Sequence, residues 1–242
     1  MTLAGKTVVV VGGTSGVGLH IVLQAAAAGA KAVGLGRSPL RVAAAQEKAR
    51  AAGVAAVFEQ ADGTDETSLR AALERHAPIA HVVASALDAE EHALGDFRKT
   101  GTAGLKRGMN KFWLSCTLIE QSDDLLEPDG SITLMSGSDE RKAWPGVVAH
   151  AIVGGALNAL VRTLAIELAP HRINVICPGP TVDSVNDAIE RPQRVTGMQP
   201  WGERFPLKRV GDSSEVAHGA LFLMTNGYVT GTILDIDGGA SV

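Results

Sequence analysis

A glycine-rich loop near the start of the sequence has the residue types and spacing needed to bind phosphate. The stretch "GGTSGVG", residues 12–18, follows the apolar run "TVVVV" and has the spacing G-x-x-x-G-x-G. Glycines at this spacing allow a tight turn, and they let a pyrophosphate approach backbone N–H groups at a helix N-terminus, where the helix dipole favours negative charge. The sequence therefore predicts a nucleotide phosphate site. Its expected residues are Gly12, Thr14, Ser15, Gly16, Val17 and Gly18.

Arg37 is the residue expected to select the cofactor. The second apolar run ends in "GLGRS", where Gly36 is followed by Arg37. Folds that bind NAD normally place an acidic residue here to hydrogen-bond the ribose hydroxyls. An arginine suits the 2′-phosphate of NADP, because a guanidinium can bind phosphate with two hydrogen bonds and no carboxylate repels it. We therefore expect NADP(H) as the cofactor; the alternative is that Arg37 is a solvated loop residue.

Asp62, in "EQADGTD", is a candidate for the adenine end of the same ligand. Its carboxylate can accept a hydrogen bond from the adenine amino group. The alternative interpretation is a carboxylate that serves a helix N-terminus or a turn.

These candidate residues are carried by short β-branched runs that alternate with Ala-rich helical stretches. The alternation predicts an α/β fold, a Rossmann-type doubly wound parallel sheet of about seven strands with helices on both faces. The expected strands are "TVVVV", "KAVGL", "AAVFE", "IAHVV", "SITLM", "INVIC" and "TILDI". The stretch from Pro178 to Gly211 is the one long interruption, and loops of that length are usually functional lids or disordered.

Composition limits the other possibilities. The 242 residues suffice for one large α/β domain spanning 1–242, and the net charge of −4 argues against nucleic-acid or membrane partners. Cys116 and Cys177 lie in apolar context without metal-type spacing, so we expect neither a metal site nor a disulfide. The N-terminal apolar run is too short to span a bilayer and lacks a cleavage pattern, which favours a cytoplasmic location.

Over essentially its whole length the sequence resembles the short-chain dehydrogenase/reductase (SDR) family. The resemblance rests on "GGTSGVG", "ADG", "GSITLMSG", "LVRTLAIELAPHRINVICPGP" and "RVGDSSEVAHGALFLMTNGYVTGTILDIDGG". In that family a tyrosine acts as general acid and base, a lysine four residues later lowers its pKa, and a serine and an asparagine complete the site. The resemblance implies hydride transfer between NADP(H) and a small-molecule carbonyl or alcohol, in a homodimer or homotetramer.

The family's catalytic positions are changed in this chain. Alignment of the helix "AHAIVGGALNALVRTLAIELAP" puts His150 at the tyrosine position and Gly154 at the lysine position, so the Tyr-x-x-x-Lys pair is lacking. Gly137 falls at the serine position, with Ser136 and Ser138 on either side. The site described by the resemblance is therefore altered at its proton-donating end.

Lys111 is the residue that aligns best with the family's asparagine, although Asn110 beside it keeps the register open. An unperturbed imidazole titrates near about pH 6.5, so a protonated fraction exists at neutral pH, and a neighbouring cation reduces that fraction. We interpret His150 and Lys111 as proton donor and polariser, with Lys111 entering the space beside Gly154 and the Ser136 or Ser138 hydroxyl assisting. The alternatives are a packed His150, a solvated Lys111, and a glycine pair that lets a second helix approach closely.

The resemblance also extends the cofactor site. The family's "NNAG" after the fourth strand is replaced by residues 84–87, and Thr181 is the candidate contact for the nicotinamide carboxamide, with Ser184 as the alternative register. The further cofactor residues implied are Asp62, Gly63, Ala84, Pro178, Gly179 and Thr181.

Two segments bear on the substrate. Residues 96–111 hold five Lys and Arg against one acid, which suits an anionic substrate or carrier protein, or else a solvated basic face. Residues 184–210 correspond to the family's substrate lid, where Met198, Trp201 and Phe205 can cover an apolar substrate or anchor the loop.

The function that we expect is that of an NADP(H)-dependent oxidoreductase with an altered proton-donor site. The alternatives are an NADP(H)-binding sensor and a non-catalytic subunit of an SDR hetero-oligomer. Family resemblance alone does not decide among them.

Overall fold

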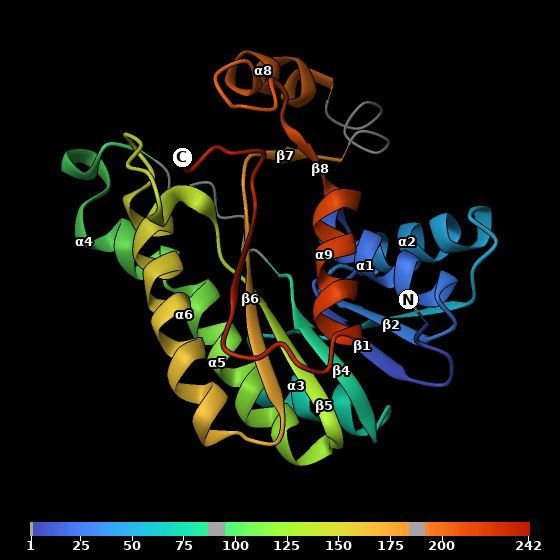
Figure 1. The fold of residues 1–242 in the computed structure, drawn as a ribbon. Coiled ribbons are helices and arrows are strands. Elements are labelled where there is room, and N and C mark those ends of the chain that lie inside the picture. Colours follow the sequence, from blue (N-terminus) through green and yellow to red (C-terminus); the bar gives the residue numbers. More distant parts are fainter. Residues whose placement is uncertain (1, 87–94, 184–191) are drawn as a thin grey trace.

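The computed structural model describes residues 2–86, 95–183 and 192–242, and it is built around one parallel sheet (Figure 1). The sheet has seven strands in the order β3-β2-β1-β4-β5-β6-β9. In chain order they are β1 (Thr7–Val11), β2 (Lys31–Gly36), β3 (Ala56–Gln60), β4 (Ile79–Ala84), β5 (Leu126–Met135), β6 (Arg172–Pro178) and β9 (Ile233–Ile236). The predicted doubly wound sheet and its strand runs are confirmed.

The strands are buried on both faces, as β1 illustrates. Val8 and Val10 pack into one core cluster, while Val9 and Val11 pack into the other. Because successive side chains of a strand point to opposite faces, a run of valines suits a strand covered on both sides.

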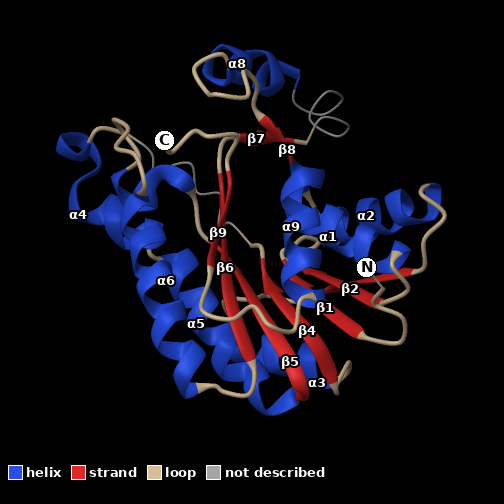
Figure 2. Ribbon diagram, viewed as in Figure 1, coloured by secondary structure: helices blue, strands red, loops and turns tan. Residues whose placement is uncertain are grey.

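Helices cover both faces of the sheet (Figure 2). The first core cluster lies under α1 (Gly16–Ala27), α2 (Pro39–Ala51) and α9 (Ser213–Thr225). The second lies under α3 (Glu66–Glu74), α5 (Asn110–Ser122) and α6 (Val148–Glu167). The helix α4 (Phe97–Gly108) packs against α5 and α6, and two 3-10 turns, η2 (Asp123–Leu125) and η3 (Ser138–Glu140), flank β5.

The topology places the site. The chain leaves β1 toward β2 and β3, then returns to place β4 on the other side of β1, so the strand order switches direction between β1 and β4. In open α/β sheets, ligands bind beyond the carboxyl ends of the strands at such a switch point. The loops after β1 and β4 are therefore the expected walls of the ligand site.

The long interruption between β6 and α9 contains structure that the sequence pattern does not predict. A two-stranded sheet pairs β7 (Thr181–Val182) with β8 (Gly211–Asp212), and α8 (Pro192–Gly202) lies beyond the carboxyl edge of the main sheet (Figure 1). Strands of two residues are too short to give a period-2 pattern. The first part of the proposed lid, residues 184–191, lies outside the described residues.

The helix α6 is long and apolar enough to meet the length and composition criteria for crossing a membrane. In this fold its buried residues, among them Val153, Leu157 and Val161, pack into the core against the sheet. A core helix of a soluble protein passes the same test, so α6 is weak support for a membrane span.

Candidate active site

The glycine loop connects β1 to α1, and its glycines are required by close contacts. A Cβ at Gly12 would lie 2.4 Å from the backbone N of Ala86, and one at Gly18 would lie 2.1 Å from the carbonyl O of Gly12. Gly12 and Gly16 have φ values of +84° and +51°, which favour glycine. The loop after β1 is thus packed directly against the loop after β4, at the switch point of the sheet.

The same loop leaves backbone donors available. Within the described part of the chain, the N–H groups of Thr14, Ser15 and Gly16 donate to no carbonyl, and Ser15 is the N-cap of α1 without a side-chain cap bond. A Cβ at Gly16 would meet no heavy atom within 4 Å. Free N–H groups at an open helix N-terminus suit an anion such as a pyrophosphate. Val17, in the first turn of α1, belongs to the same segment.

Arg37 lies directly after β2, next to this loop. A Cβ at Gly36 would be 2.6 Å from the side chain of Thr14, so the phosphate loop is packed against the end of β2. Burial raises the pKa of the Asp62 carboxyl, but hydrogen bonds from Thr64 and the charge of Arg37 outweigh this effect and lower the pKa below its usual value. Arg37 and Asp62 therefore lie close enough to interact at one edge of the sheet.

Asp62 itself serves a turn, which was one of the two interpretations of its role. Its Oδ1 accepts hydrogen bonds from the Thr64 backbone N at 2.9 Å and from Thr64 Oγ1 at 2.7 Å. Asp65, not Asp62, is the N-cap of α3. Gly63 follows, and a Cβ there would lie 2.8 Å from Val11 Cγ1, which brings this turn against the end of β1.

The remaining cofactor candidates end their strands at the same edge. Ala84 is the last residue of β4 and Pro178 the last of β6, while Thr181 opens β7. Gly179 packs against the loop after β9, because a Cβ there would lie 2.7 Å from Asp237 Cα. The fold therefore brings all the predicted cofactor residues to the carboxyl edge of the sheet. Leu87, the last residue of the 84–87 stretch, and Ser184, the alternative to Thr181, lie outside the described residues.

Lys111 reaches into the protein from α5. Its Nζ donates a hydrogen bond of 2.9 Å to the carbonyl O of Ser136, just after β5. Burial lowers the pKa of Lys111 to about 8, although the charge of Asp139 acts to raise it. Lys111 is therefore no solvated helix charge.

His150 lies in the first turn of α6 and faces a carboxylate. Its Nδ1 is 3.5 Å from Asp139 Oδ2, within ion-pair distance. The side chains are 40% exposed for His150 and 29% for Asp139, so the pair lies at the surface of the site. Asp139 thus lies within ion-pair distance of His150 and close enough to Lys111 for its charge to act on the pKa of that lysine.

The space beside Gly154 is occupied differently from our expectation. The three heavy atoms nearest to a Cβ at Gly154 are Glu140 Cγ at 3.0 Å, Glu140 Cβ at 3.1 Å and Ser136 Oγ at 3.2 Å. Glu140 is held there by Asn158 Nδ2, at 2.5 Å from its Oε1, and by Arg141 Nε at 2.8 Å. The expectation that Lys111 enters this space is wrong, because the Glu140 side chain already fills it.

Ser136 and Ser138 are both buried, at 5% and 6% exposure. The Ser136 Oγ has no hydrogen-bond partner among the described residues, and it packs against Gly154. Ser138 opens η3, and its carbonyl accepts a hydrogen bond from Arg141 N. Their assistance in catalysis stays a prediction.

The structure adds residues to this cluster that the sequence did not indicate, among them Arg141 and Asp235. Arg141 bridges Glu140 and Asp235, whose Oδ1 is 3.4 Å from Arg141 Nε. Burial and the charge of Asp235 raise the pKa of the Cys177 thiol to about 12, so Cys177 is the small buried group that its apolar context predicted. The dipeptide Asp139-Glu140, placed directly after a buried strand and two serines, was the available signal for the acidic part of this cluster.

The single tyrosine of the chain cannot supply the family's usual proton donor in this fold. Tyr228 is fully exposed and lies between α9 and β9. The neighbouring Val229 carbonyl accepts hydrogen bonds from Arg172 and Asn174 at the start of β6, so Tyr228 sits at the amino edge of the sheet. Proton transfer at the carboxyl edge needs another residue type.

The segment with α8 contacts the rest of the fold through two tryptophans. Trp201 of α8 and Trp144, which precedes α6, have ring centroids 5.5 Å apart. Phe205 is buried at 3% exposure, whereas Met198 is partly buried. Phe205 therefore anchors the segment, whereas Trp201 is 42% exposed.

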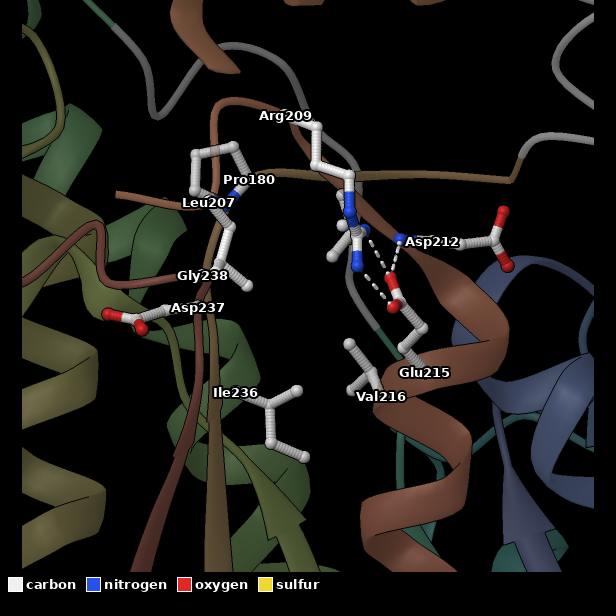
Figure 3. A pocket seen from close by; sticks show the side chains of 11 residues that line it. Pro180, Leu207, Arg209, Asp212, Glu215, Val216, Ile236, Asp237 and Gly238 are labelled. Carbon is white, nitrogen blue, oxygen red and sulfur yellow. Dashed lines mark hydrogen bonds and ion pairs between the residues drawn. The ribbon is translucent and has the colours of Figure 1, made fainter. Parts of the chain in front are cut away.

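A small cavity of about 100 Å³ is lined by residues of β7, α9 and β9 and of the segment 207–212 (Figure 3). Val216 of α9 and Ile236 of β9 face each other across it, and Arg209 forms two hydrogen bonds with Glu215 at its rim. None of the predicted catalytic residues lines this cavity, and of the cofactor candidates only Thr181 does.

The basic segment forms α4 and the start of α5. Arg98, Lys99 and Lys106 are exposed, whereas Arg107 is partly buried. Lys106 and Arg107 lie in the last turn of α4, where cations are favoured by the helix dipole.

The fold and the switch-point loops define a Rossmann-type α/β protein. The family model described as enoyl-(acyl carrier protein) reductase matches residues 11–241. Galactitol 2-dehydrogenase (L-tagatose-forming) of Cereibacter sphaeroides is 31% identical over 99% of this chain and 96% of its own length. The short-chain dehydrogenase/reductase ATR9 of Stachybotrys chlorohalonatus is 28% identical over 99% and 98%. The chain belongs to the short-chain dehydrogenase/reductase family of oxidoreductases.

Solved structures agree with this assignment. A short-chain dehydrogenase/reductase from Serratia marcescens matches with a TM-score of 0.85 at 25% identity, covering 100% of both chains. A small-chain dehydrogenase in complex with NADPH matches with a TM-score of 0.77 at 27% identity, covering 98% of this chain and 99% of that one.

The two neighbouring glycines of α6 give a first prediction. A Cβ at Gly155 would meet no heavy atom within 4 Å, whereas one at Gly154 would press on Glu140 and Ser136. We expect Gly155→Ala to raise the free energy of unfolding by about 1 kcal/mol, since alanine is the better helix former. Gly154→Ala should lack this gain, because Glu140 is tied to Asn158 and Arg141. Urea unfolding measures both; equal gains would contradict the tight packing at Gly154, and a loss at Gly155 would favour a second helix covering that face.

Proposed function

We propose that this protein is an NADP(H)-dependent oxidoreductase that transfers hydride between nicotinamide and a small-molecule carbonyl or alcohol. The observation that carries the proposal is the position of Arg37, directly after Gly36, the last residue of β2, which packs against Thr14 of the glycine loop. Family membership and the NADPH complex of a structural relative support the choice of NADP(H).

The residues present fit this cofactor. The N–H groups of Thr14, Ser15 and Gly16, which donate to no carbonyl among the described residues, suit the pyrophosphate, and the Arg37 guanidinium suits the 2′-phosphate. Asp62 keeps one carboxylate oxygen outside its turn with Thr64, so it can still meet the adenine amino group. Thr181 is the candidate for the carboxamide.

When bound, the nicotinamide supplies or accepts the hydride. The protein must then transfer a proton to or from the substrate oxygen. We assign this proton transfer to His150. Lys111, whose amine is held at the Ser136 carbonyl, adds positive charge near the reacting oxygen. The Ser136 and Ser138 hydroxyls are the remaining candidates for hydrogen bonds to the substrate.

Further parts of the proposal concern the setting of the reaction. We assign residues 184–210 to a substrate lid within a single domain, and we expect a homodimer or homotetramer located in the cytoplasm. The alternatives are an NADP(H)-binding sensor, which keeps the cofactor site without turnover, and a non-catalytic subunit of an SDR hetero-oligomer, which does not need the cofactor.

The experiment is a paired titration of the purified protein with NADPH and NADH, followed by binding heat. We expect saturable binding that favours NADPH. Arg37→Ala should weaken NADPH by roughly 10- to 100-fold, because a hydrogen-bonded charge pair contributes about 1.5–3 kcal/mol, and should change NADH little.

The matched control is Arg50→Ala, which removes the same charge from the far end of α2. Equal weakening of both nucleotides by Arg37→Ala would contradict the assignment of this residue to the 2′-phosphate. No binding of either nucleotide would refute the cofactor proposal and leave the non-catalytic subunit. Binding without turnover over a carbonyl panel, with partner association that depends on NADPH, would favour the sensor.

A further inference from the structure

The short turn η3 carries two neighbouring acidic residues, Asp139 and Glu140, whose side chains contact different partners. Glu140 points toward α6, where Asn158 and Arg141 hold its carboxylate. Asp139, the preceding residue, faces His150. The turn itself is closed by the hydrogen bond from Arg141 N to the Ser138 carbonyl, at 3.0 Å. Because Glu140 is fixed, the neighbouring Asp139 is held in a defined place relative to the start of α6.

The contact involves a particular nitrogen of the imidazole. Asp139 Oδ2 is 3.5 Å from Nδ1, whereas Nε2 makes no hydrogen bond within the described part of the chain. An acceptor at one ring nitrogen fixes the tautomer and leaves the other nitrogen available for chemistry. Contacts of this kind are often long without substrate and tighten when substrate binds.

We propose that Asp139 is a positioning residue that holds His150 through Nδ1, so that Nε2 exchanges the proton with the substrate oxygen. The inference rests on the proposed function and assigns a residue to it. As a carbonyl is reduced, its carbon receives the hydride from the nicotinamide, its oxygen takes the proton from Nε2, and solvent returns a proton to the exposed ring. In alcohol oxidation each transfer runs in reverse.

Asp139 also acts on the second candidate, Lys111. Its charge acts to raise the pKa of Lys111, whose amine is directed to the Ser136 carbonyl. Lys111 therefore contributes charge from the interior, while His150, 40% exposed, remains the group in exchange with solvent.

The chain contains a matched control pair. His171 Nδ1 lies 3.0 Å from Asp123 Oδ1, which is the same kind of contact. His171 immediately precedes β6, so this pair lies at the amino edge of the sheet, opposite the site. Asp123→Asn repeats the chemical change of Asp139→Asn away from the reaction.

The test reads the tautomer directly from the ¹⁵N shifts of the imidazole nitrogens in histidine-labelled protein, with His150→Phe to assign the signal. We expect neutral His150 to carry its proton on Nδ1. Asp139→Asn should move it to Nε2, because the asparagine amide can donate to Nδ1, and should lower kcat by roughly 10- to 100-fold. Asp139→Glu should partly restore both the proton on Nδ1 and the wild-type kcat. Asp123→Asn should change the His171 signal without changing kcat.

Two results would overturn the inference: a wild-type His150 protonated on Nε2, or a kcat that Asp139→Asn leaves unchanged in a protein where His150→Phe lowers it. The spectrum needs neither cofactor nor substrate. If the spectrum changes as expected but the protein shows no turnover, the contact between Asp139 and His150 is supported. The proposed oxidoreductase function is then refuted.

Discussion

Replacement of His150 by phenylalanine is expected to lower kcat by roughly 10²- to 10⁴-fold while leaving the dissociation constant for NADPH within about twofold of the wild-type value. Phenylalanine keeps an aromatic ring at the first turn of α6 but cannot hold or release a proton. Nucleotide binding should persist because the phosphate loop and Arg37 lie on other elements, α1 and β2. Steady-state kinetics and the NADPH titration, performed on the same preparation, check both parts.

His171→Phe is the control for this substitution. It removes a histidine that also pairs with an aspartate, but at the amino edge of the sheet. We expect kcat to be unchanged. If His150→Phe leaves kcat unchanged, the assignment of His150 as proton donor is contradicted. Lys111 would then be the remaining candidate among the predicted residues.

Lys111→Met is expected to change how stability depends on pH. Burial lowers the pKa of Lys111 from 10.5 to about 8 in the folded protein. Between these two values the unfolded chain binds a proton that the folded chain does not, so the free energy of unfolding of the wild-type protein rises with pH. The difference between wild type and variant should therefore shift by about 3 kcal/mol in favour of wild type from pH 7 to pH 10.5.

Urea unfolding of both proteins across this range measures the shift. The loss of the hydrogen bond to Ser136 changes the two stabilities by an amount independent of pH, and titration of Cys177 affects both proteins alike, so the slope isolates Lys111. Lys99→Met, an exposed lysine on α4, controls for the loss of one positive charge. A difference that stays flat with pH for Lys111→Met would show that the Lys111 amine is solvated in the folded protein.

The sheet and the cofactor edge were predictable from sequence for a physical reason. Buried parallel strands need continuous β-branched runs, and a phosphate loop needs glycines where other backbones approach closely, as at Gly12 and Gly18. Both requirements are local in the chain and therefore visible in it.

The catalytic end was predictable only in part, because its contacts join residues far apart in sequence. The position of Lys111 near Ser136 agrees with its alignment to the family's asparagine, but its hydrogen-bond partner is a backbone carbonyl that carries no sequence signal. The occupant of the space beside Gly154 could not be predicted, since Glu140 reaches it from η3. The β7–β8 pair was missed because two residues show no periodicity.

The Glu140 side chain beside Gly154 restricts how this site can be redesigned. A lysine introduced at 154 would have to displace a carboxylate that Asn158 and Arg141 already hold, and its removal would leave those two side chains without their acceptor. Positions 140 and 154 are thus coupled, because the Glu140 side chain occupies space that a side chain at 154 would need. We therefore expect conversion of this arrangement to a tyrosine–lysine pair to need changes on both η3 and α6.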